Sequence, residues 1–372
     1  MEPWSGKRWL VLLFACAGGV RTGEAPAPAP TSLVNCTWSW RALGCIPAVD
    51  CKLKWKPRLG SFGPCVPHAA VTVISAECKD AAAFAPTQKE HFDSVYNHAD
   101  PRPYYVGLQS TEYRIPWVVA RAVAAFAEHA AGRQRPLRVI DFGCGYGAVG
   151  AMLRHNLTMR DVYSHYAADE WHPTRPEGHR ALDKQWYAQH RDAGTPEVTI
   201  TGLDVAGNAL AYAVEMGLID AAAPENLVSA APSAELREQL LAADLVVEAG
   251  AKNDGGIQLG VFRAILATGA RPHILRVTRP DTDMGDVDAL LARTGYATTS
   301  IGPLVRYRKP LGQAEEKRVL ELAAGLGISA AEAFTDGYIA VRLRFSVPAA
   351  EHGAPAALDG LEERCRALGC FD

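Results

Sequence analysis

The most constraining feature of this 372-residue chain is an alternation of short apolar runs and helical patterns that begins at Leu137. The apolar runs predict seven strands, at residues 137–142, 198–203, 227–228, 245–247, 273–277, 300–307 and 338–345. Helical patterns lie between them, at residues 148–155, 206–216, 233–240, 257–266 and 284–293. Strands that alternate with helices form a mostly parallel sheet with helices on both faces. We therefore expect a doubly wound α/β fold whose ligand site lies at the carboxyl ends of the strands.

The first predicted strand runs directly into a glycine-rich loop. Residues 139 to 150 read Val-Ile-Asp-Phe-Gly-Cys-Gly-Tyr-Gly-Ala-Val-Gly. Glycines at a strand-to-helix turn let the backbone approach a ligand closely. The helix that follows offers free amides and the positive end of its dipole. This loop predicts a bound cofactor.

Two classes of cofactor fit the spacing of the glycines. Gly145, Gly147 and Gly150 satisfy the dinucleotide fingerprint G-x-G-x-x-G, which is typical of NAD enzymes. A carboxylate at Asp141 would repel an anionic pyrophosphate, and it suits a ligand that carries an ammonium group and a sulfonium. The next acid, Asp204, lies much farther from the glycines than the ~20 residues of a dinucleotide unit. The two acids favour S-adenosylmethionine over NAD.

The pattern Asp141-x-Gly143-x-Gly145-x-Gly147 resembles the first motif of the class I S-adenosylmethionine-dependent methyltransferases, and Asp204 follows in their style. The resemblance covers roughly residues 137–345. It implies a Rossmann-like fold, S-adenosyl-L-methionine as the cofactor and an acid held close to the methionine portion of that cofactor. It also implies that the second acid binds the ribose hydroxyls. The implied cofactor-binding residues are Asp141, Gly143, Gly145, Gly147 and Asp204.

Four further segments resemble a group of bacterial class I methyltransferases that carry an insertion between the first two strands. These segments are residues 91–96, 100–105, 113–116 and 153–163. The insertion spans residues 156–196 and is rich in His, Trp and Tyr. A helix predicted over residues 116–129 precedes the first strand, and we expect this region to fold over the ligand-binding edge.

The methyl acceptor is less well marked than the cofactor. Residues 243–254 lack the Asn or Asp followed by Pro-Pro and an aromatic that marks enzymes acting on adenine or cytosine amino groups. They also lack a Pro-Cys pair for attack on a cytosine carbon. The net charge of -3 provides no basic field for nucleic acid. We expect a small-molecule acceptor and no nucleic-acid partner.

No side chain stands out as the catalytic base. The weak candidates are Glu248, with a strand-end carboxylate bonded to a loop amide as the alternative, and His91, His155 and His165, for which a surface or core histidine is the more common reading. Weak candidates for the adenine edge are Asp220 and Asn226. In-line positioning supplies much of the rate of a methyl transfer, so the lack of an evident base is compatible with activity.

The two ends of the chain differ from the alternating core. A basic start, a short apolar run and an Ala-Cys-Ala site predict a secretory or organelle-targeting signal over residues 1–23. Five cysteines between Cys36 and Cys78 predict disulfides, with free buried thiols as the alternative. A zinc site is disfavoured because no Cys-x-x-Cys occurs. The boundaries that we predict are a signal (1–23), an Ala/Pro linker (24–35), a cysteine-bearing extension (36–80), a helical lid region (81–136), a methyltransferase domain (137–347) and a tail (348–372).

Two classes of function remain open at this point. One is a methyltransferase, favoured because both acids and all three glycines of the motif are intact. The other is a non-catalytic secreted or lumenal binding protein that retains the fold. The signal-like start favours the secretory pathway or an organelle, with the cytoplasm as the alternative. No apolar run after the signal reaches the roughly 20 residues of a membrane span, so we expect no stable span after signal removal.

Overall fold

The computed structural model describes residues 52–56, 73–77, 96–129, 135–168, 176–250, 254–349 and 360–371. The chain divides into two units, Met1–Lys89 and Glu90–Asp372. In the first unit, β1 (Lys52–Lys56) and β2 (Val73–Glu77) pair antiparallel. The predicted signal, the linker, the five cysteines of the 36–80 extension and His91 all lie outside the described residues.

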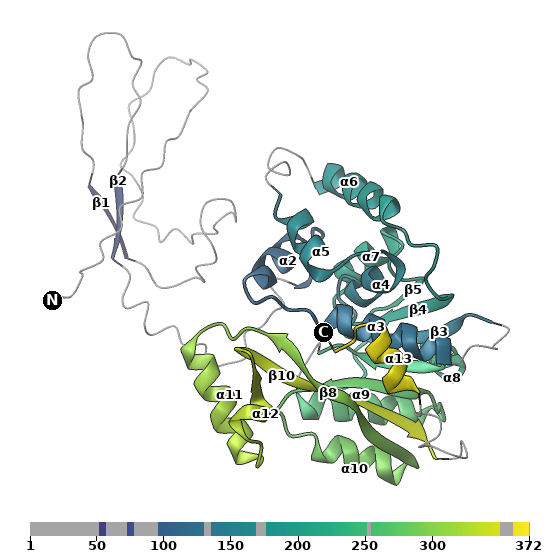
Figure 1. The fold of residues 1–372 in the computed structure, drawn as a ribbon. Helices are drawn as coiled ribbons and strands as arrows, with labels where there is room; N and C mark the ends of the chain where they lie inside the picture. Colours follow the sequence, from purple (N-terminus) through teal and green to yellow (C-terminus); the bar gives the residue numbers. More distant parts are fainter. Residues whose placement is uncertain are drawn as a thin grey trace, which may run out of the picture. The chain divides into compact units, whose positions relative to one another are not determined.

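The second unit is built on a large twisted sheet, drawn as arrows in Figure 1. Its strand order is β5-β4-β3-β6-β7-β10-β8, and β9 pairs with β10 outside this path. The strands are β3 (Leu137–Phe142), β4 (Val198–Leu203), β5 (Ala221–Ala223), β6 (Leu245–Glu248), β7 (His273–Thr278), β8 (Tyr296–Arg308), β9 (Phe334–Thr335) and β10 (Tyr338–Pro348). The first five are mutually parallel, whereas β10 runs antiparallel between β7 and β8. The doubly wound, mostly parallel sheet expected from the resemblance is confirmed.

The third strand is the one that the sequence misplaced. It lies at Ala221–Ala223 rather than at residues 227–228, and it pairs with β4 at the edge of the sheet. Three alanines carry no β-branched or aromatic signal, so local propensity could not identify them as a strand. Leu227 is buried in the apolar cluster that also holds Ile140, Leu236 and Val261, so its apolar character serves packing rather than strand pairing.

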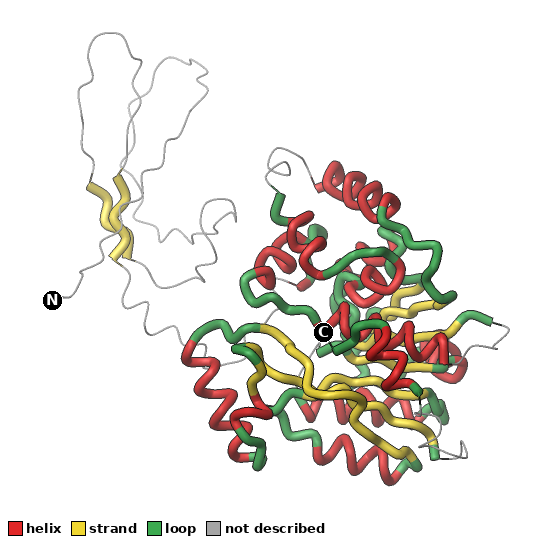
Figure 2. The backbone as a smooth tube through the Cα atoms, in the orientation of Figure 1, coloured by secondary structure: helices red, strands yellow, loops and turns green. Residues whose placement is uncertain are grey.

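Helices cover both faces of the sheet, as Figure 2 shows with helices in red and strands in yellow. The helices on one face are α3 (Ile115–His129), α4 (Ala148–Arg154), α7 (Gly207–Glu215) and α13 (Leu361–Ala367). Those on the other face are α8 (Ala234–Ala242), α9 (Gly255–Ala267) and α10 (Gly285–Arg293). We call the helices on the first face the first layer and those on the other face the second layer. Within β3, Val139 faces the first layer and Ile140 faces the second layer, because successive side chains of a strand point to opposite faces. α11 (Gln313–Gly325) and α12 (Ala330–Ala333) connect β8 to the β9–β10 hairpin. No helix in the described ranges is long and apolar enough to cross a bilayer.

The end of the chain belongs to the core. α13 packs against α3, and Leu361, Cys365 and Cys370 are buried in the same apolar cluster as the first helical layer. Both of these cysteines are free thiols, and so is Cys144 in the glycine loop.

Three more helices belong to the region before β3 and to the segment between β3 and β4. α2 (Arg102–Gln109) precedes α3, while α5 (Met159–Tyr166) and α6 (Pro176–Gln189) form the predicted insertion. α5 begins at a capping box, in which the side chains of Thr158 and Asp161 each accept a hydrogen bond from the other residue's backbone amide. α2 and α5 lie side by side (Figure 1).

Candidate functional site

The glycine loop joins β3 to α4 and is fastened to the end of β4. The Gly143 amide donates to the Leu203 carbonyl at 2.8 Å, and the Gly147 amide donates to the Cys144 carbonyl at 3.0 Å. Gly143, Gly145 and Gly147 have φ values of 74°, 51° and 74°. These left-handed conformations favour glycine at each of the three positions.

Two of these glycines serve different purposes. A Cβ on Gly147 would lie 2.9 Å from the Cβ of Ala213 and 3.0 Å from that of Leu218, so Gly147 is needed for packing. Among the described residues, a Cβ on Gly145 would meet only the ring of Tyr96, at 3.5 Å. Gly145 is therefore the position at which backbone can lie against a ligand, with Tyr96 as its neighbour.

Asp141, at the end of β3, is a buried carboxylate. Its side chain is 1% exposed and accepts no hydrogen bond from a nitrogen or oxygen donor among the described residues. Burial raises its pKa to about 7; the nearby charge of Asp204 adds to this rise, and the Cys144 thiol opposes it. Burying a charge without a partner is costly. A cation bound beside Asp141 would offset that cost.

Asp204 follows β4 directly and is half-buried. One carboxylate oxygen accepts the Gly145 amide at 2.9 Å, and the other accepts the Ala206 amide at 3.0 Å. Each carboxylate oxygen can accept more than one hydrogen bond, so both retain capacity for a ribose hydroxyl. The structure thus brings together all five predicted residues, Asp141, Gly143, Gly145, Gly147 and Asp204.

Asp141→Asn should make the ligand-free protein more stable above pH 7. The folded-state pKa of about 7 lies above the ordinary value of 3.8, so the folded protein holds this proton more tightly than the unfolded chain does. The stability that this tightly held proton contributes to the folded protein is fully present below pH 3.8. It is lost as the pH rises to 7, by up to about 1.4 kcal/mol per pH unit. Urea unfolding of both proteins from pH 4 to pH 8 measures the difference. Identical pH slopes would contradict the assignment of a buried carboxylate.

Glu248, one of the weak candidates for the catalytic base, is buried at the end of β6. It is fully buried and lies on the same sheet face as Val246, which packs under α9 and α10. Its neighbour in register on β7 is the fully buried Arg276, which forms an ion pair with Asp288. Asp141 points to the opposite face, with Val139. Glu248 therefore points toward the helices α9 and α10, on the face of the sheet opposite to Asp141.

The other weak candidates hold the fold together. His155 is buried, and burial lowers its pKa to about 4 while its Nδ1 bonds to the Ala151 carbonyl. Asp220 accepts the Ile200 amide and pairs with Arg154. Asn226 accepts the Val228 amide within its own turn.

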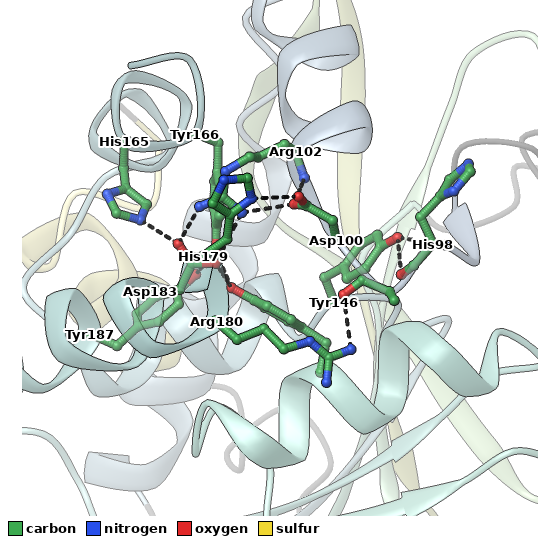
Figure 3. Close-up of polar contacts among 12 residues, drawn as sticks. His98, Asp100, Arg102, Tyr146, His165, Tyr166, His179, Arg180, Asp183 and Tyr187 are labelled. Atoms are coloured by element: carbon green, nitrogen blue, oxygen red, sulfur yellow. Dashed lines mark hydrogen bonds and ion pairs between the residues drawn. The ribbon is translucent and has the colours of Figure 1, made fainter. Parts of the chain in front are cut away.

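His165 belongs to a buried polar network that links the insertion to α2 (Figure 3). At its centre Asp183 of α6, fully buried, accepts from Arg102 at 2.8 Å, from His165 at 2.9 Å and from the Tyr212 hydroxyl at 2.9 Å. Arg102 also pairs with Asp100, whose second oxygen contacts His179 at 3.0 Å. The network fixes α2, α5, α6 and α7 to one another.

Asn97 and His98, in the predicted lid region, lie against the loop through contacts that sequence reasoning did not predict. The hydroxyl of Tyr146, between Gly145 and Gly147, accepts the His98 amide and donates to the His98 carbonyl, each at 3.0 Å (Figure 3). Asn97 accepts the Asn208 amide at 2.9 Å and its carbonyl accepts the Asn208 side chain at 2.9 Å. Tyr146 occupies an unspecified position of the motif, so no sequence pattern pointed to it.

No family model and no curated protein matches this chain. Several solved methyltransferase structures are similar to it. The ribosomal protein L11 methylase from Lactobacillus delbrueckii subsp. bulgaricus is 11% identical over 49% of this chain and 71% of that chain, with a TM-score of 0.27. The plantazolicin methyltransferase BamL, solved with a triazolic desmethylPZN analog and SAH, is 12% identical over 69% of this chain and 96% of that chain, with a TM-score of 0.35. The magnesium protoporphyrin IX methyltransferase from Synechocystis PCC 6803, with bound SAH, is 11% identical over 66% and 86%, with a TM-score of 0.33.

Proposed function

We propose that this protein is an S-adenosylmethionine-dependent methyltransferase that acts on a small-molecule acceptor. The observation that carries the proposal is the buried carboxylate of Asp141, without a nitrogen or oxygen hydrogen-bond donor in the described part of the chain, beside the left-handed backbone of Gly145. A site built this way suits a ligand with positive charge at one end. A dinucleotide would instead bring its anionic pyrophosphate to this loop.

The residues present fit the cofactor in three respects. Asp141 supplies negative charge for the ammonium and sulfonium end, and Asp204 supplies acceptors for the ribose hydroxyls. Gly145 keeps the loop free of a side chain on the side that faces the ring of Tyr96. When bound, S-adenosylmethionine supplies a methyl group activated by a positively charged sulfur. The protein's own task is then to orient the two reactants and to exclude water.

The surroundings of the β6 end indicate what kind of acceptor atom the site needs. This end lies next to the glycine loop, because β6 pairs in register with β3. The Tyr113 hydroxyl donates to the Ala249 carbonyl at 2.6 Å, and its ring packs edge-on against Tyr307. Burial raises the pKa of Tyr113 and of Tyr104 well above the usual range, so both stay neutral and cannot serve as bases at ordinary pH. We infer an acceptor that is nucleophilic without deprotonation by these side chains, such as an amine or a thiolate.

The location of the protein also remains a proposal. Residues 1–23 favour delivery to the secretory pathway or an organelle.

A protein that binds S-adenosylhomocysteine but methylates nothing would support the alternative of a non-catalytic binding protein.

Gly145→Val should abolish binding of S-adenosylhomocysteine, because a branched side chain would occupy the face that the ligand approaches. Isothermal titration of the full chain measures this. Gly269→Val is the matched control, since Gly269 also has a positive φ, of 90°, but no atom of the described residues lies within 4 Å of an added Cβ. The control should share the backbone strain and keep the affinity. A Gly145→Val protein that binds as tightly as the parent would show that the loop is not the cofactor site.

A further inference from the structure

The segment Tyr96–Asp100, which we call the strap, connects the glycine loop to the start of α7. Tyr146 of the loop holds both backbone groups of His98 (Figure 3). Asn208, the second residue of α7, holds Asn97 through two hydrogen bonds. Because Asp204 lies between β4 and α7, the strap is fastened beside both predicted cofactor-binding loops.

The base of the strap is fixed by charge. Asp100 bonds to the amide and the guanidinium of Arg102, at 3.0 and 2.8 Å, and Arg102 reaches the buried Asp183 (Figure 3). Asp100 also contacts His179 of α6. The strap is therefore tied at its base, at His98 and at Asn97, and these ties limit where Tyr96 can lie.

Tyr96 itself lies against the glycine loop. Its ring carbons Cε1 and Cδ1 would be 3.5 and 3.7 Å from a Cβ on Gly145. Its ring centroid lies 4.7 Å from that of Tyr104, to which its hydroxyl bonds. Burial raises the pKa of this phenol, and the nearby Asp204 adds to the rise, so the ring stays neutral.

We propose that Tyr96 forms an aromatic wall of the methyl-donor site and favours the cationic sulfonium over the neutral sulfide of the product. This inference rests on the proposed function. A cation within about 6 Å of an aromatic centroid is attracted to the ring, whereas a neutral thioether gains much less. Tyr96 would thus help the enzyme to release its product, S-adenosylhomocysteine, in exchange for fresh S-adenosylmethionine.

The test compares two ligands that differ by one methyl group and one charge. Isothermal titration of the full chain gives the affinities for S-adenosylmethionine and S-adenosylhomocysteine in the parent, Tyr96→Phe and Tyr96→Leu. Tyr96→Leu should weaken S-adenosylmethionine roughly twofold to thirtyfold and S-adenosylhomocysteine less. Tyr96→Phe should keep the parent's ratio of affinities. Equal weakening of both ligands, or no change in the ratio, would overturn the inference.

Asn208→Ala provides a second variant that leaves the ring intact. It removes one of the two bonds to Asn97, so it should shift the ratio in the same direction by a smaller factor. The double variant of Asn208→Ala and Tyr96→Leu should have the same ratio of affinities as Tyr96→Leu alone, because the strap affects binding through the Tyr96 ring. Tyr338→Leu, on β10, is the control and should leave both affinities unchanged. If the parent binds neither ligand, the proposed function is wrong. If the parent binds both ligands and the ratio of the two affinities is the same in the Tyr96 variants, only this inference is wrong.

Discussion

Replacing Asp183 by alanine is expected to cost about 3–5 kcal/mol of the free energy of unfolding. The carboxylate is fully buried and accepts hydrogen bonds from Arg102, His165 and Tyr212. Without it, the half-buried guanidinium of Arg102 loses its ion pair with the fully buried carboxylate and keeps its ion pair with the half-buried Asp100. Removing one member of a buried ion pair is costly because the remaining charge loses its compensation.

Urea unfolding, followed by circular dichroism, measures this loss. Glu362→Ala is the control, because Glu362 pairs with Arg366 on the exposed surface of α13. Exposed pairs of this kind are worth less than about 1 kcal/mol. If Asp183→Ala costs no more than Glu362→Ala, the network of Figure 3 does not stabilise the fold.

Gly150→Ala is expected to be the most damaging small substitution in the glycine loop region. A Cβ at Gly150, in α4, would lie 2.0 Å from the carbonyl oxygen of Leu218. That atom belongs to the backbone, so the helix or the α7–β5 connection must move. Overpacking costs typically 1–3 kcal/mol, and the absence of a flexible side chain puts this case at the upper end.

Gly107→Ala is the matched control for that substitution. Gly107 is also helical, in α2, but an added Cβ there has no atom within 4 Å. Alanine should therefore stabilise the protein by up to about 1 kcal/mol. Chemical unfolding of the two variants should give changes of opposite sign. Changes of the same sign and size would contradict the close packing of α4 on the α7–β5 connection.

Hydrophobic periodicity was sufficient to predict most of this fold. Buried parallel strands are continuous apolar runs, and their predicted positions at residues 137–142 and 198–203 coincide with β3 and β4. The method failed at Ala221–Ala223, where pairing at the sheet edge determines a strand that has no local signal. The predicted site residues Asp141 and Asp204 lie together because the carboxyl ends of adjacent parallel strands meet at one edge.

What the sequence could not predict depends on contacts between distant segments. Asn97 and Asn208 are 111 residues apart, and Arg102 and Asp183 are 81 apart, so no spacing rule relates them. Glu248 looked like a site residue because it ends a strand. The face of the sheet to which its side chain points depends on its exact position in the strand. A strand prediction that is uncertain by one residue cannot assign that face, because a shift of one residue moves every side chain to the other face.

The central claim is that the glycine loop and the two acids bind S-adenosylmethionine. The most direct test is isothermal titration of the parent, Asp141→Asn and Asp204→Ala with S-adenosylmethionine and with NAD. Charge-assisted hydrogen bonds are each worth roughly 1.5–3 kcal/mol, and about 1.4 kcal/mol is a factor of ten, so Asp204→Ala should bind S-adenosylmethionine at least about tenfold more weakly.

Asp141→Asn should change the binding affinity in opposite directions for the two classes of cofactor. Losing the carboxylate should weaken binding of the cationic sulfonium, whereas it should leave binding of a pyrophosphate unchanged or improved. The account predicts that the parent binds S-adenosylmethionine, that both variants bind it more weakly and that none of the three binds NAD. A parent that does not bind S-adenosylmethionine, together with tighter NAD binding in Asp141→Asn, would contradict it.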